Sequence, residues 1–185
     1  EGDRRQEYLE AIVSETDRMD GMILRMLELS RLEAGRVKFQ REEFRLDELV
    51  EETLVRYQPS ITGKGLTLEK DLSATVVSAD RERVEEIIEN LLTNAVKYCR
   101  QNGGIKISCR QRNRGGGELT VYNDADPLTE EAIERVWEPF YRVSSSRTDR
   151  GTGLGLPIVR GLVELHGGET YVRNTDGGVE FGFRI

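Results

Sequence analysis

The chain has 185 residues, of which 37% are hydrophobic and 33% are charged. This length and composition suit one sizeable hydrophobic core with an appended element, and they argue against intrinsic disorder. The net charge of -7 argues against a nucleic-acid partner. Because no apolar run approaches the roughly 20 residues that span a bilayer, and no signal-peptide pattern opens the chain, we expect a water-soluble piece.

A long amphipathic helix is predicted from about residue 4 to Gly35. Apolar side chains recur there at spacings of three, four and seven, and Gly35 is a natural C-cap. The stripe consists of Leu9, Ile12, Val13, Met19, Met22, Ile23, Met26, Leu27 and Leu29. Its width favours an arm that packs against another helix, as in a bundle or coiled coil. The alternative is a helix that packs on its own domain.

Shorter elements follow the arm. The run VKFQREEFRL predicts a strand, and Asp47 is placed to N-cap a helix that reaches about Gln58, before the breaker Pro59. Two strand-like runs follow between 66 and 77, and Asp80 can cap a helix from 81 to about 100.

The second half of the chain predicts a hairpin, two helices and a second hairpin. The strands of the first hairpin are 105–109 and 119–122, one helix spans 129–136, the other follows the glycine turn and ends at Leu165, and the last hairpin turns at 177–178. These elements predict an α+β fold, an α/β sandwich in which a mixed sheet has helices on one face, preceded by the long N-terminal helix. We place the two parts at 1–36 and 37–185.

Cysteine and histidine usage limits the chemistry. Cys99 and Cys109 lack the paired spacing of a zinc or redox site, so a reducing compartment fits best. His166 is the only histidine, which excludes a multi-histidine metal site. It follows an apolar helix, where we expect it to pack or to cap the helix end.

The run GTGLGLPIV at 151–159 is the most informative motif. Gly151, Gly153 and Gly155 precede an apolar-periodic helix, so the backbone can approach phosphates and direct N–H groups at them. Such a turn alone is more often ordinary loop chemistry. It gains weight from two upstream runs, ENLLTNAVKYC at 89–99 and WEPFYRV at 137–143.

Polar side chains line one face of the helix that begins at residue 81. Asn90, Asn94 and Lys97 are spaced by four and three, so they share that face. Amide oxygens suit Mg²⁺, Lys97 can neutralise a phosphate, and Tyr98 offers a ring beside a purine. The alternative is that the asparagines cap neighbouring strand ends and that Lys97 is simply exposed.

Together these runs resemble the boxes of the histidine kinase catalytic domain, within the ATPase family that includes gyrase and the Hsp90 chaperones. ENLLTNAVKYC resembles the asparagine box, WEPFYRV the phenylalanine box, and GTGLGLPIVRGLVELHGG the second glycine box with its helix. The arm EYLEAIVSETDRMDGMILRMLELSRLEAG resembles the second helix of the dimerisation and phosphoacceptor hairpin. The resemblance covers nearly the whole chain.

The resemblance implies a site for ATP and Mg²⁺. Asn90 and Asn94 would be the catalytic and metal-binding residues, Lys97 and Arg142 would touch phosphates, and Tyr98 would line the adenine pocket. The glycine turn would close over the phosphates, with 142–152 as a mobile lid. That turn consists of Gly151, Thr152, Gly153, Leu154, Gly155 and Leu156.

The first glycine box departs from the family pattern. VYNDADPLTEE has Asn123, Ala125 and Pro127 where the family usually has an Asp and two glycines. The amide oxygen of Asn123 can accept a hydrogen bond from the adenine amino group, without the charge that strengthens the bond. Asp124 would take this role if the register slipped by one residue. Because these glycines are missing, the sequence does not determine the local path of the backbone.

The resemblance implies two-component signalling, in which the γ-phosphoryl of Mg-ATP is transferred to a histidine and relayed to a response-regulator Asp. The acceptor is expected upstream of Glu1 and not at His166, so the chain should bind ATP without autophosphorylating. The parent would be a homodimer, usually membrane-anchored, with this part in the cytoplasm.

Two other functions stay open. One is a degenerate nucleotide-binding or partner-docking domain, motivated by the altered first glycine box. The other is a non-kinase ATPase or a serine kinase of the same superfamily. In hydrolysing relatives a Glu that activates water occupies the position of Asn90, so this sequence favours a kinase. Glu86, one turn earlier, is expected on a solvated helix face.

Overall fold

The computed structural model describes residues 2–112, 116–143 and 151–185. Its body is a five-stranded sheet in the order β2-β4-β5-β7-β6. The strands are β2 (Thr67–Leu72), β4 (Gly104–Gln111), β5 (Gly117–Asp124), β6 (Glu169–Thr175) and β7 (Gly178–Arg184). Strands β2 and β4 are parallel and the other neighbours are antiparallel, so the sheet is mixed, as predicted.

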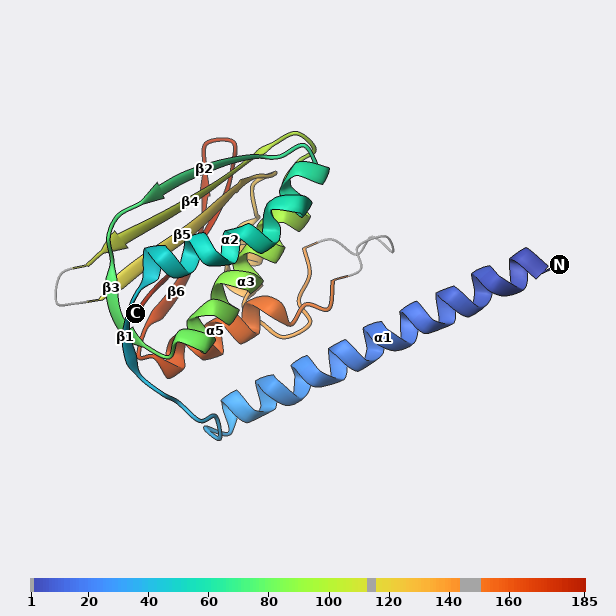
Figure 1. Cartoon of the computed structure of the whole chain (residues 1–185), viewed down its shortest axis with the longest axis horizontal. Helices are drawn as coiled ribbons and strands as arrows, with labels where there is room; N and C mark the ends of the chain where they lie inside the picture. The colour runs from blue at the N-terminus through green and yellow to red at the C-terminus, as the bar shows by residue number, and fades with distance from the viewer. Residues whose placement is uncertain (1, 113–115, 144–150) are drawn as a thin grey trace.

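Three helices cover one face of this sheet (Figure 1). They are α2 (Leu46–Gly63), α3 (Arg81–Tyr98) and α5 (Gly155–Leu165). Strand residues alternate between the two faces: Ile105 and Ile107 are buried under the helices, whereas Lys106 pairs with a carboxylate on the other face. The predicted α/β sandwich is therefore confirmed.

Smaller elements complete the body. Strands β1 (Glu42–Arg45) and β3 (Val76–Ala79) form a separate two-stranded antiparallel sheet. The predicted strand at 37–46 is therefore shorter than expected. Helix α4 (Glu130–Arg135) begins after Thr129, whose side chain accepts a 3.1 Å hydrogen bond from the backbone N–H of Ala132.

The predicted N-cap of α2 is wrong. Arg45 occupies the cap position without a side-chain cap bond, and Asp47 lies inside the first turn. The Asp47 carboxylate instead pairs with the Arg45 guanidinium and accepts a 2.9 Å hydrogen bond from the N–H of Thr75. These contacts, chiefly that with Arg45, lower the pKa of Asp47 to about 2. A charged partner and a backbone donor from a distant loop replace the local cap.

Helix α2 also continues through Pro59, where we expected it to end. A proline removes the hydrogen bond to the carbonyl four residues earlier, here that of Val55, whose side chain is 73% exposed. Ile61, in the next turn, is only 1% exposed. Core packing of Ile61 therefore keeps the last turn helical.

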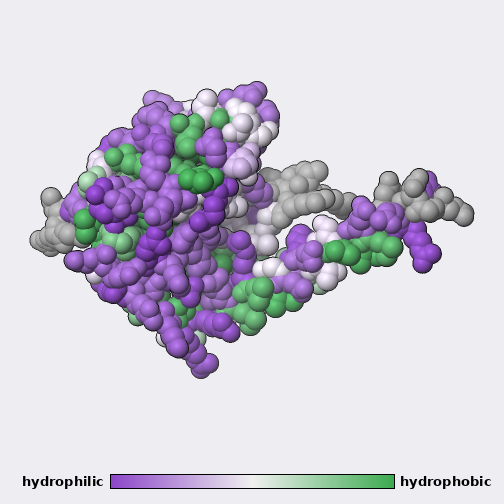
Figure 2. All heavy atoms as spheres, in the orientation of Figure 1, coloured by the Kyte–Doolittle hydropathy of each residue, from purple (hydrophilic) through white to green (hydrophobic). Residues whose placement is uncertain are grey.

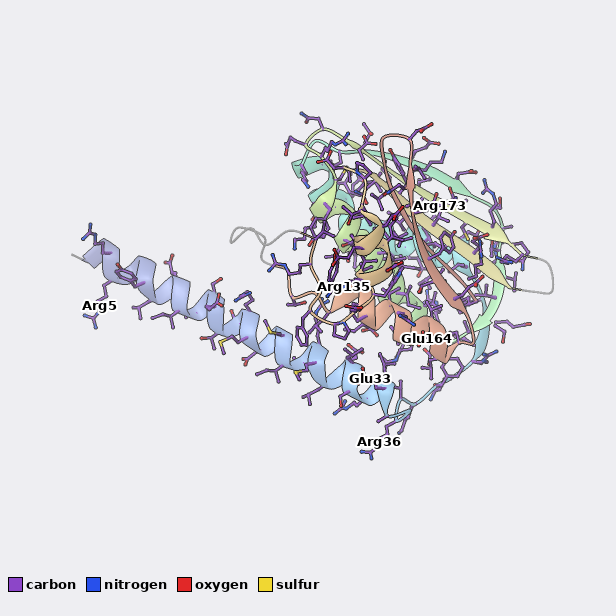
Figure 3. The ribbon with its side chains drawn as sticks, turned by 180° about the vertical axis from the view of Figure 1, so that it is seen from behind. Arg5, Glu33, Arg36, Arg135, Glu164 and Arg173 are labelled. Atoms are coloured by element: carbon purple, nitrogen blue, oxygen red, sulfur yellow. The ribbon has the colours of Figure 1, made fainter. Side chains whose placement is uncertain are left out.

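Helix α1 (Gly2–Glu33) leaves the body as a long arm (Figure 1). Its C-terminal end contacts the body: Leu29 is buried, and Figure 3 shows Glu33 beside α5, the helix that carries Glu164. Farther toward the N-terminus the apolar stripe is in solvent (Figure 2). The large apolar residues of α1 that are more than half exposed are Tyr8, Leu9, Ile12, Val13, Met19, Ile23, Leu24, Met26 and Leu27. Among the described residues, no helix combines the length and apolarity needed to cross a membrane.

His166 packs against the segment between α1 and β1, residues 34–41, and bonds to it. Its Nδ1 donates to the carbonyl of Leu162 at 2.7 Å, and its Nε2 accepts from the N–H of Asp80 at 3.1 Å. Because a carbonyl only accepts, these bonds select one neutral tautomer. The ring is edge-on to Phe39, with centroids 4.7 Å apart, and the Arg41 guanidinium donates to the His166 carbonyl. The expected packing role is confirmed.

We expect His166 to make the stability of the fold depend on pH. Burial lowers its pKa below the ordinary value of 6.5, despite the nearby Asp80 carboxylate. The stabilisation from the neutral ring is therefore complete above pH 6.5 and is lost as pH falls through the folded-state pKa. In urea unfolding, this should remove up to about 1.4 kcal/mol per pH unit within that window. His166→Gln should lack this component, and equal slopes in both proteins would contradict the assignment.

Candidate functional site

Helix α3 is the axis of the site, because it lies against both α5 and β5. Asp80 caps it as predicted, accepting a 3.2 Å hydrogen bond from the N–H of Arg83. The apolar side of α3 is buried, including Ile87 and Leu91. Asn94 lies half-buried at the edge of that core, and its carboxamide makes no hydrogen bond with another described residue.

Asn90 contacts the arm. Its Nδ2 donates to the carbonyl of Glu86 at 2.8 Å, and its Oδ1 accepts from Nη1 of Arg25 on α1 at 3.1 Å. Glu86 is not on a solvated face as we expected, because it pairs with Arg83 at 2.9 Å and lies beside Glu28 of α1. Burial, together with the Glu86 carboxyl, raises the pKa of Glu28 to about 7. Both polar ends of the Asn90 side chain are therefore engaged when the arm is docked.

The hollow between the arm and α3 is not a nucleotide pocket. Its volume is about 180 Å³, below the roughly 300 Å³ at which small-molecule sites begin. Its lining has three carboxyl groups, those of Glu28, Glu86 and Glu89, against the single guanidinium of Arg25, which disfavours phosphates. In the described part of the chain, no three His, Cys, Asp or Glu side chains are grouped to hold a metal ion.

The second glycine motif touches both α3 and the phenylalanine motif. A Cβ atom at Gly155 would lie 3.0 Å from Oδ1 of Asn90. Gly153 has a φ of 70°, and a Cβ atom there would lie 2.8 Å from Cα of Phe140. The N–H of Phe140 donates to the Gly153 carbonyl at 2.9 Å. The positive φ and the close backbone of Phe140 therefore require glycine at position 153, whereas a side chain at position 155 would press on that of Asn90.

The start of α5 has backbone N–H groups that an anion could use. Leu154, fully buried, occupies the N-cap position without a side-chain cap bond, and its N–H donates to Oγ1 of Thr152 at 3.4 Å. The N–H groups of Gly155 and Leu156, in the first turn, have no partner within the helix. The helix dipole adds partial positive charge at the same end.

Lys97 and Tyr98 form a pair at the other end of α3. Nζ of Lys97 lies 3.1 Å from the Tyr98 hydroxyl and 4.7 Å from the centre of its ring. Asn123, at the end of β5, is 2% exposed, and its carboxamide makes no hydrogen bond with another described residue. The carboxamide therefore keeps donor and acceptor atoms that a ligand could bond to.

The carboxylate of Asp124 is held by hydrogen bonds within the fold. Its carboxylate accepts hydrogen bonds from the hydroxyl of Tyr122 at 2.6 Å and from the N–H of Gly104 at 2.7 Å. These bonds, that from Tyr122 first, lower the pKa of Asp124. The register slip that would turn Asp124 toward a ligand is therefore not seen, and Asn123 keeps the inward position.

Side chains hold the segment that lacks the family glycines. Arg100 donates to the carbonyl of Ala125 at 2.8 Å. Asn174 on β6 clamps Leu128 by accepting from its N–H and donating to its carbonyl, both at 2.8 Å. No residue of 123–128 has a positive φ. The segment therefore adopts this path without glycine, and the sequence pattern alone did not reveal Arg100 or Asn174 as its supports.

The remaining predicted residues lie around the phenylalanine motif. Arg142 is exposed, and Gly151 and Thr152 are half-buried. Most of the predicted lid, 144–150, lies outside the described residues. Trp137 is a core residue, 9% exposed and edge-on to Phe181 with centroids 5.9 Å apart.

Known proteins are similar to this chain in sequence and fold. Residues 79–185 match the family described as histidine kinase-, DNA gyrase B-, and HSP90-like ATPase. An uncharacterised sensor-like histidine kinase of Rhizobium meliloti (strain 1021) is 30% identical over 96% of this chain and 34% of that protein. The solved catalytic domain of the histidine kinase ThkA, nucleotide-free, is 32% identical with a TM-score of 0.72, over 79% of this chain and 95% of that one.

A further solved structure, ThkA in complex with the response regulator protein TrrA, matches over 96% of this chain and 50% of that chain, with a TM-score of 0.77 and 27% identity. The chain spans about a third of the length of the curated relatives it matches. The matched family region contains all the predicted site residues, from Asn90 to Leu156. The chain therefore belongs to the family of histidine kinase-, DNA gyrase B- and HSP90-like ATPases, and its body is a catalytic domain of the histidine kinase kind.

Proposed function

We propose that this chain is the ATP-binding core of a sensor histidine kinase that transfers the γ-phosphoryl of Mg-ATP to a histidine for relay to a response-regulator Asp. The observation that carries the proposal is the arrangement of the motifs along α3. The second glycine motif meets α3 at Asn90, and the first glycine box meets the second residue after the end of α3, where the N–H of Arg100 donates to the Asp124 carbonyl. At 1.5 Å per residue these points are about 15 Å apart, which leaves room for a nucleotide along the helix.

The phosphates would lie at the start of α5. The N–H groups of Gly155 and Leu156 and the helix dipole favour an anion there. Lys97 and Arg142 would add positive charge, and the turn at 151–154 would close over the phosphates. In this arrangement the γ-phosphate of the nucleotide would lie at the end of α3 that is beside the arm.

The asparagines fit Mg²⁺ unequally. The oxygen of Asn94 has no hydrogen-bond partner among the described residues, and amide oxygens are suitable ligands for this hard cation. Asn90 would serve only after its Oδ1 exchanges Arg25 for a new partner. When bound, Mg²⁺ supplies charge neutralisation on the phosphates. We therefore assign the main metal contact to Asn94.

Among the described residues, the two candidates for a phosphoacceptor and a water-activating base, His166 and Glu86, are both engaged in the fold. His166 is buried, with both ring nitrogens hydrogen-bonded within the fold, so it is not the phosphoacceptor. Glu86, the carboxylate one turn before Asn90, is engaged with Arg83. These contacts favour transfer to a histidine on another segment over hydrolysis of ATP.

Residues 1–36 would be the second helix of the dimerisation and phosphoacceptor hairpin. Its exposed apolar stripe is larger than a monomeric protein normally leaves in water, and further helices of a homodimer would cover it. The likeness to ThkA bound to TrrA supports a response regulator as the downstream partner. A membrane-anchored parent with this part in the cytoplasm is the corresponding cellular arrangement.

The first experiment is a calorimetric titration of the chain with ATP, with and without Mg²⁺. We expect saturable binding that Mg²⁺ strengthens, followed by phosphoryl transfer when a hairpin that contains an acceptor histidine is supplied. Absence of binding in both conditions would overturn the proposal and leave a degenerate domain. Binding without transfer would restrict the function to nucleotide sensing.

Adenine recognition gives a sharper prediction. Asn123→Ala should weaken MgATP binding about tenfold, because one buried hydrogen bond is lost, and Asn123→Asp should tighten it through a charged acceptor. The measurement is the ratio of ATP to GTP affinity. Val121→Ala, a cavity-forming change at a 1% exposed side chain on the same strand, should lower stability without changing that ratio. If both Asn123 variants match wild type, the alignment of the box is wrong.

A further inference from the structure

Lys64, just after α2, reaches the C-terminal end of α3. Its half-buried ammonium donates to the carbonyls of Val96 at 2.7 Å, Lys97 at 2.9 Å and Cys99 at 2.7 Å. A helix leaves its last carbonyls without intrahelical partners, and the three protons of a lysine ammonium match these three acceptors. The side chain of Lys64, the residue that follows α2, therefore caps the C-terminal end of α3.

The backbone around Lys64 limits any shift of this cap. Gly65 has a φ of 68°, and a Cβ atom there would lie 2.4 Å from Oδ1 of Asn102. The N–H of Thr67 donates to the carbonyl of Gly103 at 2.9 Å. The segment after α2 thus packs against the turn that follows α3, and these contacts fix the backbone position of Lys64.

The cap supports both sides of the proposed adenine position. Tyr98 lies between two residues whose carbonyls Lys64 binds, Lys97 and Cys99. The next residue, Arg100, donates its N–H to the carbonyl of Asp124 at 2.9 Å. Asp124 adjoins Asn123 in the chain. Hydrogen bonds therefore lead from Lys64 through the end of α3 to the end of β5.

The charge of Lys64 also acts on the site. The last turn of a helix carries partial negative charge, up to about half an elementary charge, which would repel a polyphosphate held near Lys97. An ammonium bonded directly to the terminal carbonyls offsets this charge.

We propose that Lys64 is a positioning residue of the nucleotide site. It holds the last turn of α3 so that Lys97 and Tyr98 face the ligand, and it neutralises the negative helix end. This inference rests on the proposed function, which it deepens by adding a residue that does not itself touch the nucleotide.

The test compares MgATP binding by folded variants. Lys64→Met keeps the aliphatic stem and removes the donors, so the Kd should rise about tenfold and the preference for ATP over GTP should fall. Lys64→Arg should recover most of both, and Lys64→Gln serves if the Met variant does not fold. Two variants serve as controls. Ile61→Val shortens a buried side chain of α2 and should lower the stability of that helix, and Lys70→Met removes a lysine that is paired with Glu51 at the surface. Both controls should keep the Kd within about twofold of wild type.

A purely structural role makes a different prediction. It would lower the urea midpoint of Lys64→Met while leaving the Kd and the ATP-to-GTP ratio at the values of Ile61→Val, and that result would overturn the inference. Amide hydrogen exchange without nucleotide provides an independent readout. We expect faster exchange over 95–100 in Lys64→Met, with no change over 81–90.

Failure of the proposed function can be told apart from failure of this inference. A wild-type chain that binds no MgATP contradicts the proposed function and removes the nucleotide readout. Hydrogen exchange then decides whether Lys64 holds the helix end: faster exchange confined to 95–100 supports that step, and unchanged exchange overturns it. Wild-type binding together with unchanged binding by Lys64→Met overturns the inference alone.

Discussion

Asn94→Ala is expected to abolish Mg-dependent ATP binding while the protein stays folded. Asn94 is half-buried, and its carboxamide makes no hydrogen bond with another described residue, so its removal breaks no hydrogen bond within the described part of the fold. It does remove the oxygen that we assign to the metal. Since changes to mere supporting residues of metal sites cost about 10–100-fold in affinity, loss of the ligand should cost at least about 100-fold.

Calorimetry with and without Mg²⁺ measures this loss, and urea unfolding checks that the fold is retained. Asn94→Asp is the matched variant, because a carboxylate keeps an oxygen ligand of similar length. It should retain Mg-dependent binding. If Asn94→Ala binds MgATP as tightly as wild type, the metal assignment is wrong, and Asn90 released from Arg25 becomes the candidate.

Gly153→Ala should damage both the site and the fold. The φ of 70° is unfavourable for a residue with a Cβ atom, and that atom would lie 2.8 Å from Cα and 2.9 Å from the carbonyl carbon of Phe140. Because the obstructing atoms are backbone, the phenylalanine motif and the glycine turn would have to separate. We expect a loss of about 1–3 kcal/mol in the free energy of unfolding and at least a tenfold weaker affinity for MgATP.

Gly35→Ala is the control for backbone strain alone. Gly35 has a similar φ of 62°, but a Cβ atom there would meet nothing within 4 Å. It should cost about 1 kcal/mol and leave the nucleotide affinity unchanged. Should the two variants behave alike in both assays, the close approach of Gly153 to Phe140 would have no functional importance.

Features decided by local chemistry could be predicted from the sequence. Apolar periodicity located α1, α3 and α5, and the predicted cap Asp80 bonds to the N–H of Arg83, three residues ahead. The glycine, asparagine and phenylalanine motifs indicated the family, which the matched region 79–185 confirms. In each case the signal and the residues that respond to it are neighbours in the chain.

The errors arose where a residue found a distant partner. Asp47 has the chemistry of an N-cap, yet the N–H of Thr75, 28 positions away, and the adjacent guanidinium of Arg45 compete for its carboxylate. Pro59 is a helix breaker by local rules, but burial of Ile61 outweighs the lost hydrogen bond. Such competitors depend on the packing of whole elements.

Composition, spacing and motif order were sufficient for the family, the sandwich and a list of polar residues that could face a nucleotide, because residue type and helical period are properties of the chain itself. Only the tertiary structure decided which polar atoms are already bonded. It pairs Asn90 with Arg25, 65 positions away, and brings Lys64 to the end of α3, while Asn94 and Asn123 keep their carboxamides unbonded among the described residues. That difference depends on contacts between distant segments, and sequence spacing carries no information about those contacts.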